Sequence, residues 1–375
     1  MRFAGKQGFH KFVKYNLYFE FFLMLQEVLS EYGFDFKHLN IETINNGLIN
    51  KTWLVHNGSN SYILQKINHH IFKDPDAIAF NVRKIDNYLK QHHPNYLFVA
   101  PVKTLVQQEM KYIDKDGYYR LLPFVHNSKT IKTVATTEQA YEAAKKFGEF
   151  TMLLSGFPAE ELKITLPDFH NLSLRYNQFC EALINGNTER IPPAEDAINF
   201  IRQNKNIVEE YERILKNKSF KKRVTHHDTK ISNVLFSAED KGICVIDLDT
   251  VMPGYFISDV GDMFRTYLSP ASEEEKDFSK IEIREDYFKA IWDGYMSEMN
   301  GVLTDEEKAH FIYAGKFMIY MQAMRFLTDH LNNDSYYGAS YSNHNFIRAC
   351  NQITLLKRLM EKENDLCKMI GLPLL

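Results

Sequence analysis

The sequence predicts an α+β protein, with a small antiparallel β-sheet and one helix in its N-terminal part and a larger, mostly helical C-terminal part. Short runs of alternating apolar residues, separated by turn residues, fill much of the first third of the chain. From Thr137 onward, apolar residues recur at the three- and four-residue spacing of helices. These patterns predict an N-terminal helical extension over residues 1–37, a sheet region over 38–126 and a helical region over 127–375.

The composition is that of an ordinary folded protein and points to no macromolecular partner. Of the 375 residues, 45% are apolar and 25% charged, and the net charge of −3 provides no positive field for nucleic acid. The N-terminal aromatic stretch is interrupted by polar residues, and no run approaches the roughly 18 apolar residues of a membrane span. The four cysteines show neither metal nor disulfide spacing, which favours a cytoplasmic protein. Together these features lead us to expect no nucleic-acid, membrane or protein partner.

The sheet region begins with three predicted antiparallel strands and a helix. The strands are expected over residues 41–45, 52–56 and 61–67, with Asn57-Gly58 as the second turn. A helix over 76–89 follows. Further strands are predicted over residues 98–106, 111–113 and 118–125, and they complete the sheet.

An ordered set of polar residues in the helical region indicates metal-assisted phosphoryl transfer. His226-x-Asp228 is followed five residues later by Asn233, and an apolar run over 243–246 ends at Asp247. A hydroxyl that attacks a nucleotide phosphate needs a carboxylate to accept its proton, and Mg²⁺ needs oxygen ligands. Asp228 suits the role of catalytic base. Asn233 and Asp247 suit the role of metal ligands.

Two short apolar runs are expected to hold this set together. Val234–Phe236 and residues 243–246 predict a hairpin that brings Asn233 close to Asp247. Because side chains alternate along a strand, Asp247 and Asp249 are expected to share one face and to point into the same cleft, so Asp249 is a third expected metal ligand.

The chain resembles a known enzyme superfamily in these segments. The strings HHDTKISNVLF and VIDLDTVMPG, followed by Asp259-x-Gly-Asp262, are similar to the aminoglycoside phosphotransferase and choline kinase superfamily. The resemblance runs from about Leu25 to the C-terminus and is closest to the N-acetylhexosamine 1-kinase branch. It implies a protein-kinase-like, two-lobed fold and an enzyme that uses ATP and Mg²⁺. The region over 38–126 would be the nucleotide-binding lobe, and the region over 127–375 would hold the catalytic loop and the acceptor site.

The resemblance also implies which residues bind the nucleotide. The turn at Asn46 and Gly47 occupies the position of the loop that covers the phosphates, and Phe124 lies at the expected adenine-binding hinge. Lys66 is the candidate to pair with the phosphates. Relatives with a Leu-Lys pair would place that lysine at Gln65, which faces the opposite way.

One part of the kinase pattern is missing from the sequence. The helix expected over 76–89 carries no Glu that could pair with the strand lysine. This departure leaves a nucleotide-binding pseudokinase as an alternative, although Asp228, Asn233 and Asp247 are all present.

Three further residues are implied as acceptor contacts. His170, Arg175 and Arg325 lie in segments that relatives share. For His170 and Arg175 the alternative is loop packing, and for Arg325 it is a surface ion pair with Asp329 one helical turn away.

The function that these patterns favour is a small-molecule kinase. No GxxxxGK[ST] loop or GxGxxG motif is present, which argues against P-loop and dinucleotide enzymes. The closest branch implies that ATP phosphorylates the anomeric hydroxyl of a free sugar such as an N-acetylhexosamine. A kinase of the aminoglycoside, choline or homoserine type is the alternative, and choline would need an aromatic cage, for which Tyr287, Trp292 and Tyr295 are candidates.

Overall fold

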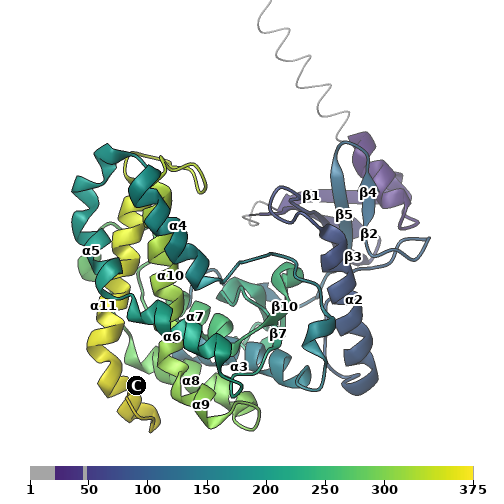
Figure 1. The fold of residues 1–375 in the computed structure, drawn as a ribbon. Coiled ribbons are helices and arrows are strands. Elements are labelled where there is room, and N and C mark those ends of the chain that lie inside the picture. Colours follow the sequence, from purple (N-terminus) through teal and green to yellow (C-terminus); the bar gives the residue numbers. More distant parts are fainter. Residues whose placement is uncertain (1–21, 45–48, 375) are drawn as a thin grey trace, which may run out of the picture. The chain divides into compact units, whose positions relative to one another are not determined.

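The chain divides into two compact units (Figure 1). The computed structural model describes residues 22–44 and 49–374. The first unit comprises the chain up to Asp86 together with Val99–His126, and the second comprises Asn87–Phe98 and Asn127–Leu375. The first unit holds the main sheet and the second holds most of the helices.

The first unit is built on a five-stranded antiparallel sheet with the strand order β1-β2-β3-β5-β4. Its strands are β1 (Leu39–Ile44), β2 (Lys51–Asn57), β3 (Asn60–Lys66), β4 (Lys111–Ile113) and β5 (Gly117–Pro123). Gly58, with φ +61°, makes the tight turn between β2 and β3 that the Asn-Gly pair predicts.

The prediction of a strand over residues 98–106 is wrong. This segment forms a single bridge, between Val102 and Leu121, and is otherwise without regular structure. Pro101 has no backbone N–H to give to a strand ladder, which explains why pairing does not extend through the segment.

One face of the sheet is covered by the helical residues 22–30. Leu25, Val28 and Leu29 pack in one cluster with side chains of the strands. The strand members of this cluster include Trp53, Val55, Leu64, Tyr119 and Leu121. Because strand side chains alternate, Gln65 and Arg120 must point to the opposite face.

Helix α2 (Pro75–His92) confirms the helix predicted after the third strand. The Asp74 side chain accepts a hydrogen bond from the backbone N–H of Ala77 and caps its start. Instead of a Glu that pairs with a strand lysine, the helix presents Arg83, which binds Glu109 at 3.1 Å.

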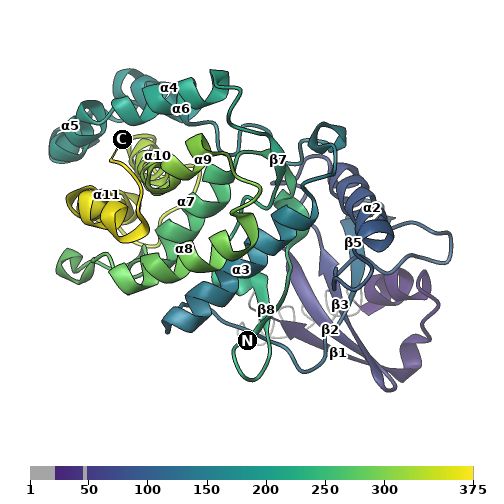
Figure 2. The ribbon, with the colours of Figure 1, turned by 90° about the horizontal axis from the view of Figure 1, so that it is seen from below.

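The second unit is a helical assembly around α10 (Figure 2). Helix α10 is buried over most of its length, which matches its largely apolar sequence. Helices α4, α7 and α11 pack against it, and α3 lies along α8. The helices are α3 (Thr137–Leu153), α4 (Leu172–Asn185), α5 (Glu195–Gln203), α6 (Asn206–Lys216), α7 (Phe256–Tyr267), α8 (Glu285–Met299), α9 (Asp305–Ala309), α10 (Phe311–Leu331) and α11 (His344–Ile370).

Short strands and single 3-10 turns complete the second unit. Strand β7 (Arg223–Thr225) pairs with β10 (Met252–Gly254), and β8 (Val234–Phe236) lies between β6 (Lys129–Thr130) and β9 (Gly242–Val245). Over both units, the 3-10 turns within residues 22–44 and 49–374 are Phe36–His38, Ala159–Glu161, Thr188–Arg190, Pro192–Ala194, Ile231–Asn233, Leu248–Thr250 and Phe278–Lys280.

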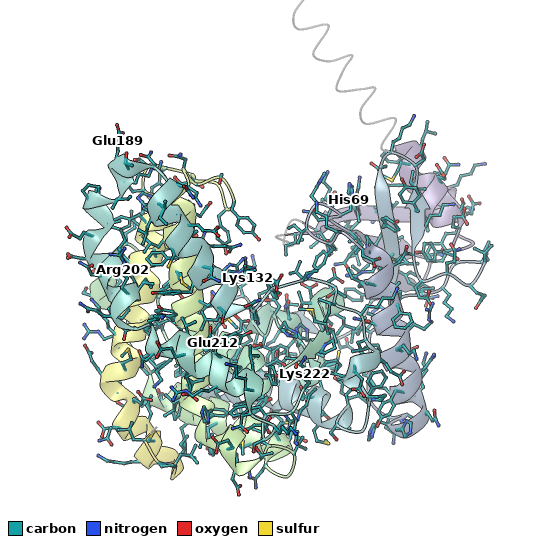
Figure 3. The ribbon with its side chains drawn as sticks, viewed as in Figure 1. His69, Lys132, Glu189, Arg202, Glu212 and Lys222 are labelled. Carbon is teal, nitrogen blue, oxygen red and sulfur yellow. The ribbon has the colours of Figure 1, made fainter. Side chains whose placement is uncertain are left out.

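Side chains fix how these helices and strands meet. Arg223 in β7 binds Glu307 in α9 through two hydrogen bonds of 2.6 and 2.8 Å, and both side chains are buried. Ser173 of α4 donates to Glu212 of α6, which is labelled in Figure 3. Helices α7 and α10 approach so closely that a Cβ atom at Gly261 would lie 2.3 Å from the carbonyl oxygen of Ala314. Glycine is therefore required at this crossing.

None of the helices that the structure describes is both long and apolar enough to cross a membrane.

Candidate active site

The predicted phosphoryl-transfer residues lie in one loop system of the second unit. The loop follows β7 and leads into the hairpin of β8 and β9, which confirms the predicted hairpin. The backbone N–H of Ile246 donates to the carbonyl oxygen of Asn233 at 2.8 Å. This bond holds Asn233 beside the residue that precedes Asp247.

Asp228 is fixed by two neighbours on one side of its carboxylate. Its Oδ2 atom accepts hydrogen bonds from Lys230 Nζ at 2.8 Å and from Asn233 Nδ2 at 2.9 Å. No other side chain or backbone group in the described residues is hydrogen-bonded to the Asp228 carboxylate, so its Oδ1 atom has no hydrogen-bond donor there. Burial alone would raise the pKa of Asp228, but the Lys230 ammonium and the hydrogen bonds outweigh it, and the pKa is lowered. Asp228 is therefore a carboxylate at neutral pH.

The interpretation that Asp247 and Asp249 share a strand face is wrong. Strand β9 ends at Val245, and Asp247 has the left-handed backbone conformation, with φ 63° and ψ 61°. Asp249 lies in the 3-10 turn that follows. As a result Asp247 is exposed, whereas Asp249 is buried at 1% exposure.

The donor set fits a magnesium ion that is also held by phosphate oxygens. Asn233 uses its Nδ2 atom to bind Asp228, which leaves the amide oxygen as a possible ligand. Burial alone would lower the pKa of Lys230, but the Asp228 carboxylate and then the Asp247 carboxylate raise it, so Asp247 acts on the same cluster. Over the described residues, no group of three His, Cys, Asp or Glu side chains could hold a metal ion by itself. Mg²⁺ in proteins often takes one or two carboxylates and completes its shell with water and phosphate oxygens.

His226 links Asp228 to the segment that leads into Asp247. Its Nε2 atom lies 3.0 Å from the carbonyl oxygen of Ile246, and its Nδ1 atom accepts from the backbone N–H of Asp228 at 3.4 Å. The ring packs edge-on against Phe147 and Phe150. Burial is the largest influence on this imidazole and lowers its pKa. A neutral ring with the proton on Nε2 satisfies both contacts.

Two acids of α7 support the catalytic loop, a role that the sequence alone does not assign. Asp259 accepts hydrogen bonds from the backbone N–H groups of both His226 and His227, at 3.1 and 2.7 Å. Asp262 accepts from the N–H of Thr229 at 2.8 Å. Because burial dominates, the pKa of Asp259 is raised to about 7. The spacing Asp-x-Gly-Asp is the signal for this support, since it places both acids on the loop side of one helix.

The structure places Lys66 and Gln65 on opposite faces of the sheet, as the alternation of a strand requires. Lys66 lies on the helix-covered face with Tyr119, and its ammonium binds Asp116 at 2.6 Å. This ion pair argues against the prediction that Lys66, rather than Gln65, faces the phosphates. On the other face, Arg120 donates to Gln65 Oε1 from Nε at 3.0 Å and from Nη2 at 2.8 Å.

Of the other three residues predicted to contact the nucleotide, the structure describes only Phe124. Asn46 and Gly47 lie outside the described residues. Phe124 directly follows β5, donates its backbone N–H to the carbonyl oxygen of Ser61 at 3.2 Å, and contacts the ring of His126.

The three predicted acceptor contacts come together near the catalytic loop. Arg175 from α4 and Arg325 from α10 line one cavity of about 390 Å³, within the size range of small-molecule sites. His170 lies against His227, with ring centroids 5.4 Å apart, and its buried Nδ1 atom has no hydrogen-bond partner among the described residues. Arg325 does not pair with Asp329. That carboxylate instead accepts the backbone N–H groups of Tyr336 and Tyr337.

The aromatic residues considered for a choline cage do not form one. Tyr295 is fully buried, Tyr287 donates its hydroxyl to the carbonyl oxygen of Ala135, and Trp292 packs edge-on against Phe311. All three belong to α8 and its packing contacts.

Comparison with known proteins agrees with this architecture. A spectinomycin phosphotransferase in complex with ADP and spectinomycin is similar in fold, with a TM-score of 0.56 at 14% identity, covering 92% of this chain and 98% of that one. An aminoglycoside phosphotransferase from Alicyclobacillus acidocaldarius gives 0.62 at 12% identity, with coverages of 92% and 96%. An amicoumacin kinase in complex with AMP-PNP and Ca²⁺ gives 0.59 at 12% identity, with coverages of 92% and 92%. The predicted α+β, kinase-like fold is confirmed.

The family model described as the phosphotransferase enzyme family matches residues 40–290 of the chain. This region includes the main sheet and the whole catalytic loop system from β7 to α7. The predicted enzyme class is thereby confirmed at the level of a phosphotransferase. Because the match covers about two thirds of its residues, the chain belongs to the phosphotransferase enzyme family.

Proposed function

We propose that this phosphotransferase is a small-molecule kinase that transfers the γ-phosphate of ATP to a hydroxyl group with the help of Mg²⁺. The arrangement of Asp228 carries the proposal. Its Oδ2 atom is held by Lys230 and Asn233, so the carboxylate is fixed and charged while Oδ1 can accept a hydroxyl proton. The similar structures that contain ADP, or AMP-PNP with Ca²⁺, support a nucleotide and a divalent cation as ligands.

The residues of the loop would divide the chemistry among them. Asp228 orients the acceptor hydroxyl and takes its proton. The Asn233 amide oxygen and the Asp247 carboxylate would hold Mg²⁺, and Asp249 is a further proposed ligand. When bound, the ion neutralises charge that develops on the phosphate oxygens. His226 and Asp259 keep the loop backbone in place and touch no substrate in this scheme.

For the nucleotide itself, the first unit supplies the proposed contacts. The Gln65 face of the sheet is the one we propose for the nucleotide, since the Lys66 face is covered by the helical residues 22–30. Asn46, Gly47 and Phe124 remain the expected contacts to the phosphates and the adenine ring.

The acceptor that we propose is a free sugar, phosphorylated on its anomeric hydroxyl, with N-acetylhexosamine as the reference compound. The motif strings around Asp228 and Asp247 support this choice. An anomeric hydroxyl is more acidic than an ordinary alcohol, so a carboxylate with a lowered pKa suffices as its base.

An acceptor screen tests the proposal. Free hexoses and hexosamines are incubated with ATP and Mg²⁺, and sugar 1-phosphate is detected by phosphorus NMR. We expect product with the wild type and none with Asp228→Ala. Turnover of choline or an aminoglycoside but of no sugar would refute the sugar assignment. Nucleotide binding without turnover of any acceptor would indicate a pseudokinase.

A further inference from the structure

The cavity between α4 and α10 contains two arginines that lack a carboxylate partner. Within the described part of the chain, neither Arg175 nor Arg325 has an Asp or Glu oxygen within 4.0 Å. Other arginines of the second unit do form such ion pairs, among them Arg190, Arg223, Arg265 and Arg348. Arg175 donates only to neutral acceptors, the side chain of Gln178 at 3.0 Å and the carbonyl oxygen of Asp168 at 2.9 Å. The Nε atom of Arg175 is buried without a hydrogen-bond partner.

Arg325 is held by weak contacts that leave most of its guanidinium N–H donors available to a ligand. It makes one long hydrogen bond, 3.4 Å, to Gln322. Its guanidinium lies over the rings of Tyr337 and Tyr336, at 5.4 and 5.9 Å from their centroids. Those contacts position the group without neutralising its charge.

The two charges act on each other across the cavity. Burial is the largest influence on Arg175 and lowers its pKa, and the neighbouring Arg325 charge lowers it further. The same two arginines contribute to lowering the pKa of the buried His170, after burial and His227. Like charges that act on each other in a partly buried site cost free energy unless an anion joins them.

The acids that line the cavity do not supply that anion. Asp329 is buried and already accepts three hydrogen bonds, from the N–H groups of Tyr336 and Tyr337 and from Asn345 Nδ2. It therefore anchors the loop after α10. Glu181 also lines the cavity, but it is exposed on α4 and contacts neither arginine within ion-pair distance.

We propose that the preferred sugar acceptor of this kinase differs from the neutral N-acetylhexosamine reference by carrying an oxyanion, as a hexuronic acid or a sugar phosphate does, and that Arg175 and Arg325 bind this group. The inference rests on the proposed kinase function. A guanidinium presents planar, paired N–H donors that match the oxygens of a carboxylate or phosphate. Tyr336, 74% exposed, offers a flat apolar surface beside them for the carbon skeleton of a sugar.

The transfer step is otherwise unchanged. The bond between the γ-phosphorus and its bridging oxygen breaks, ADP leaves with that electron pair, and the acceptor oxygen forms the new bond. The hydroxyl proton passes to Asp228.

Matched pairs of acceptors test this proposal. Glucuronic acid is compared with glucose, galacturonic acid with galactose, and glucose 6-phosphate with glucose, by kcat/KM from ADP release. We expect at least one anionic member to exceed its neutral partner by about tenfold or more. A preference for the acids or for the sugar phosphate identifies the source of the oxyanion.

Arginine variants assign the effect to the cavity. In Arg325→Met and Arg175→Met, the ratio of anionic to neutral kcat/KM should fall about ten- to a hundredfold, through KM more than kcat. Arg325→Lys should keep part of the ratio because the charge remains. Arg202→Met, an exposed arginine of α5 labelled in Figure 3, is the matched control and should keep the full ratio.

The outcomes separate this inference from the kinase proposal. Equal or better turnover of the neutral sugars would overturn the oxyanion and leave the kinase intact. If no acceptor is turned over, sugar binding is measured instead by the thermal shift of the protein. An anionic sugar that stabilises the wild type but not the folded Arg325→Met variant supports the site. Lack of any such stabilisation overturns it.

Discussion

At the scale of single residues, the candidate site is an arrangement of charges around Asp228. Lys230 binds the carboxylate directly, and Asp247 acts on Lys230 in turn. The buried histidines beside this cluster, His226 and His227, have lowered pKa values because burial disfavours their charged forms. The candidate site thus combines a charged carboxylate with neutral imidazoles.

Removing the Lys230 charge should move the pH dependence of catalysis. In Lys230→Met, burial of Asp228 is no longer offset by the ammonium, so the pKa of Asp228 rises. The acid limb of kcat against pH should shift to higher pH. Steady-state kinetics between pH 5 and 9 measures it, with Lys216→Met as the control. A loss of activity that is the same at every pH would contradict this role.

His227 should make the protein less stable in acid. Its folded-state pKa is lowered to about 4 by burial, from an ordinary value of 6.5, so the contribution to stability is present above pH 6.5 and is lost as the pH falls toward 4. Between pH 7.5 and 5, the wild type should lose on the order of 2 kcal/mol more than His227→Asn. Asparagine tolerates the φ of +66° at this position.

Urea unfolding at the two pH values measures this difference. His38→Asn is the control, since the side chain of His38 is 79% exposed. An identical pH dependence in His227→Asn and the wild type would show that His227 is not the titrating group.

At the scale of elements, helix α7 is the support of the catalytic loop. Asp259 and Asp262 accept three backbone N–H groups from the segment 226–229, and Tyr267 donates to the carbonyl oxygen of Thr229 at 2.5 Å. The helix is in turn pressed against α10 at Gly261. Any shift of α7 is therefore passed to the segment that carries Asp228.

Gly261→Ala should destabilise the protein although alanine is the better helix former. A helical Gly→Ala change usually gains about 1 kcal/mol. Here the added methyl group would meet the Ala314 carbonyl oxygen at 2.3 Å, and we expect a net loss of about 3 kcal/mol. Differential scanning calorimetry should show a fall in Tm of roughly 4–6 °C.

Gly301→Ala is the matched control for this substitution. A Cβ atom at Gly301 would meet nothing within 4 Å, so the Tm should stay within about 2 °C of the wild type. Equal effects of the two substitutions would refute the packing explanation.

At the scale of the whole molecule, the sequence predicts well those elements that local residue patterns and spacing determine. The strands β1 to β3, α2 and the β8–β9 hairpin follow from alternation, helical periodicity and the Asn-Gly turn. The positions of Asp247 and Asp249 do not, because the strand ends early and a left-handed residue redirects the chain. The partner of Lys66 also escapes prediction, since Asp116 is 50 residues away along the sequence.

Metal binding should depend on the nucleotide in the intact protein. The described residues contain no three-acid or histidine cluster for a metal, so Mg²⁺ needs phosphate oxygens to complete its shell. Mg²⁺ alone should leave the Tm unchanged, whereas ATP with Mg²⁺ should raise it more than ATP with EDTA. Asp247→Asn should reduce this difference. A clear rise with Mg²⁺ alone would contradict the prediction.

The chain has two tryptophans, and each lies in a different unit. Trp53 is buried in the sheet core of the first unit, and Trp292 packs on Phe311 in the second. Each indole is thus a built-in optical reporter of one unit. With Trp53→Phe or Trp292→Phe, intrinsic fluorescence would follow the melting of either half alone, without any attached dye.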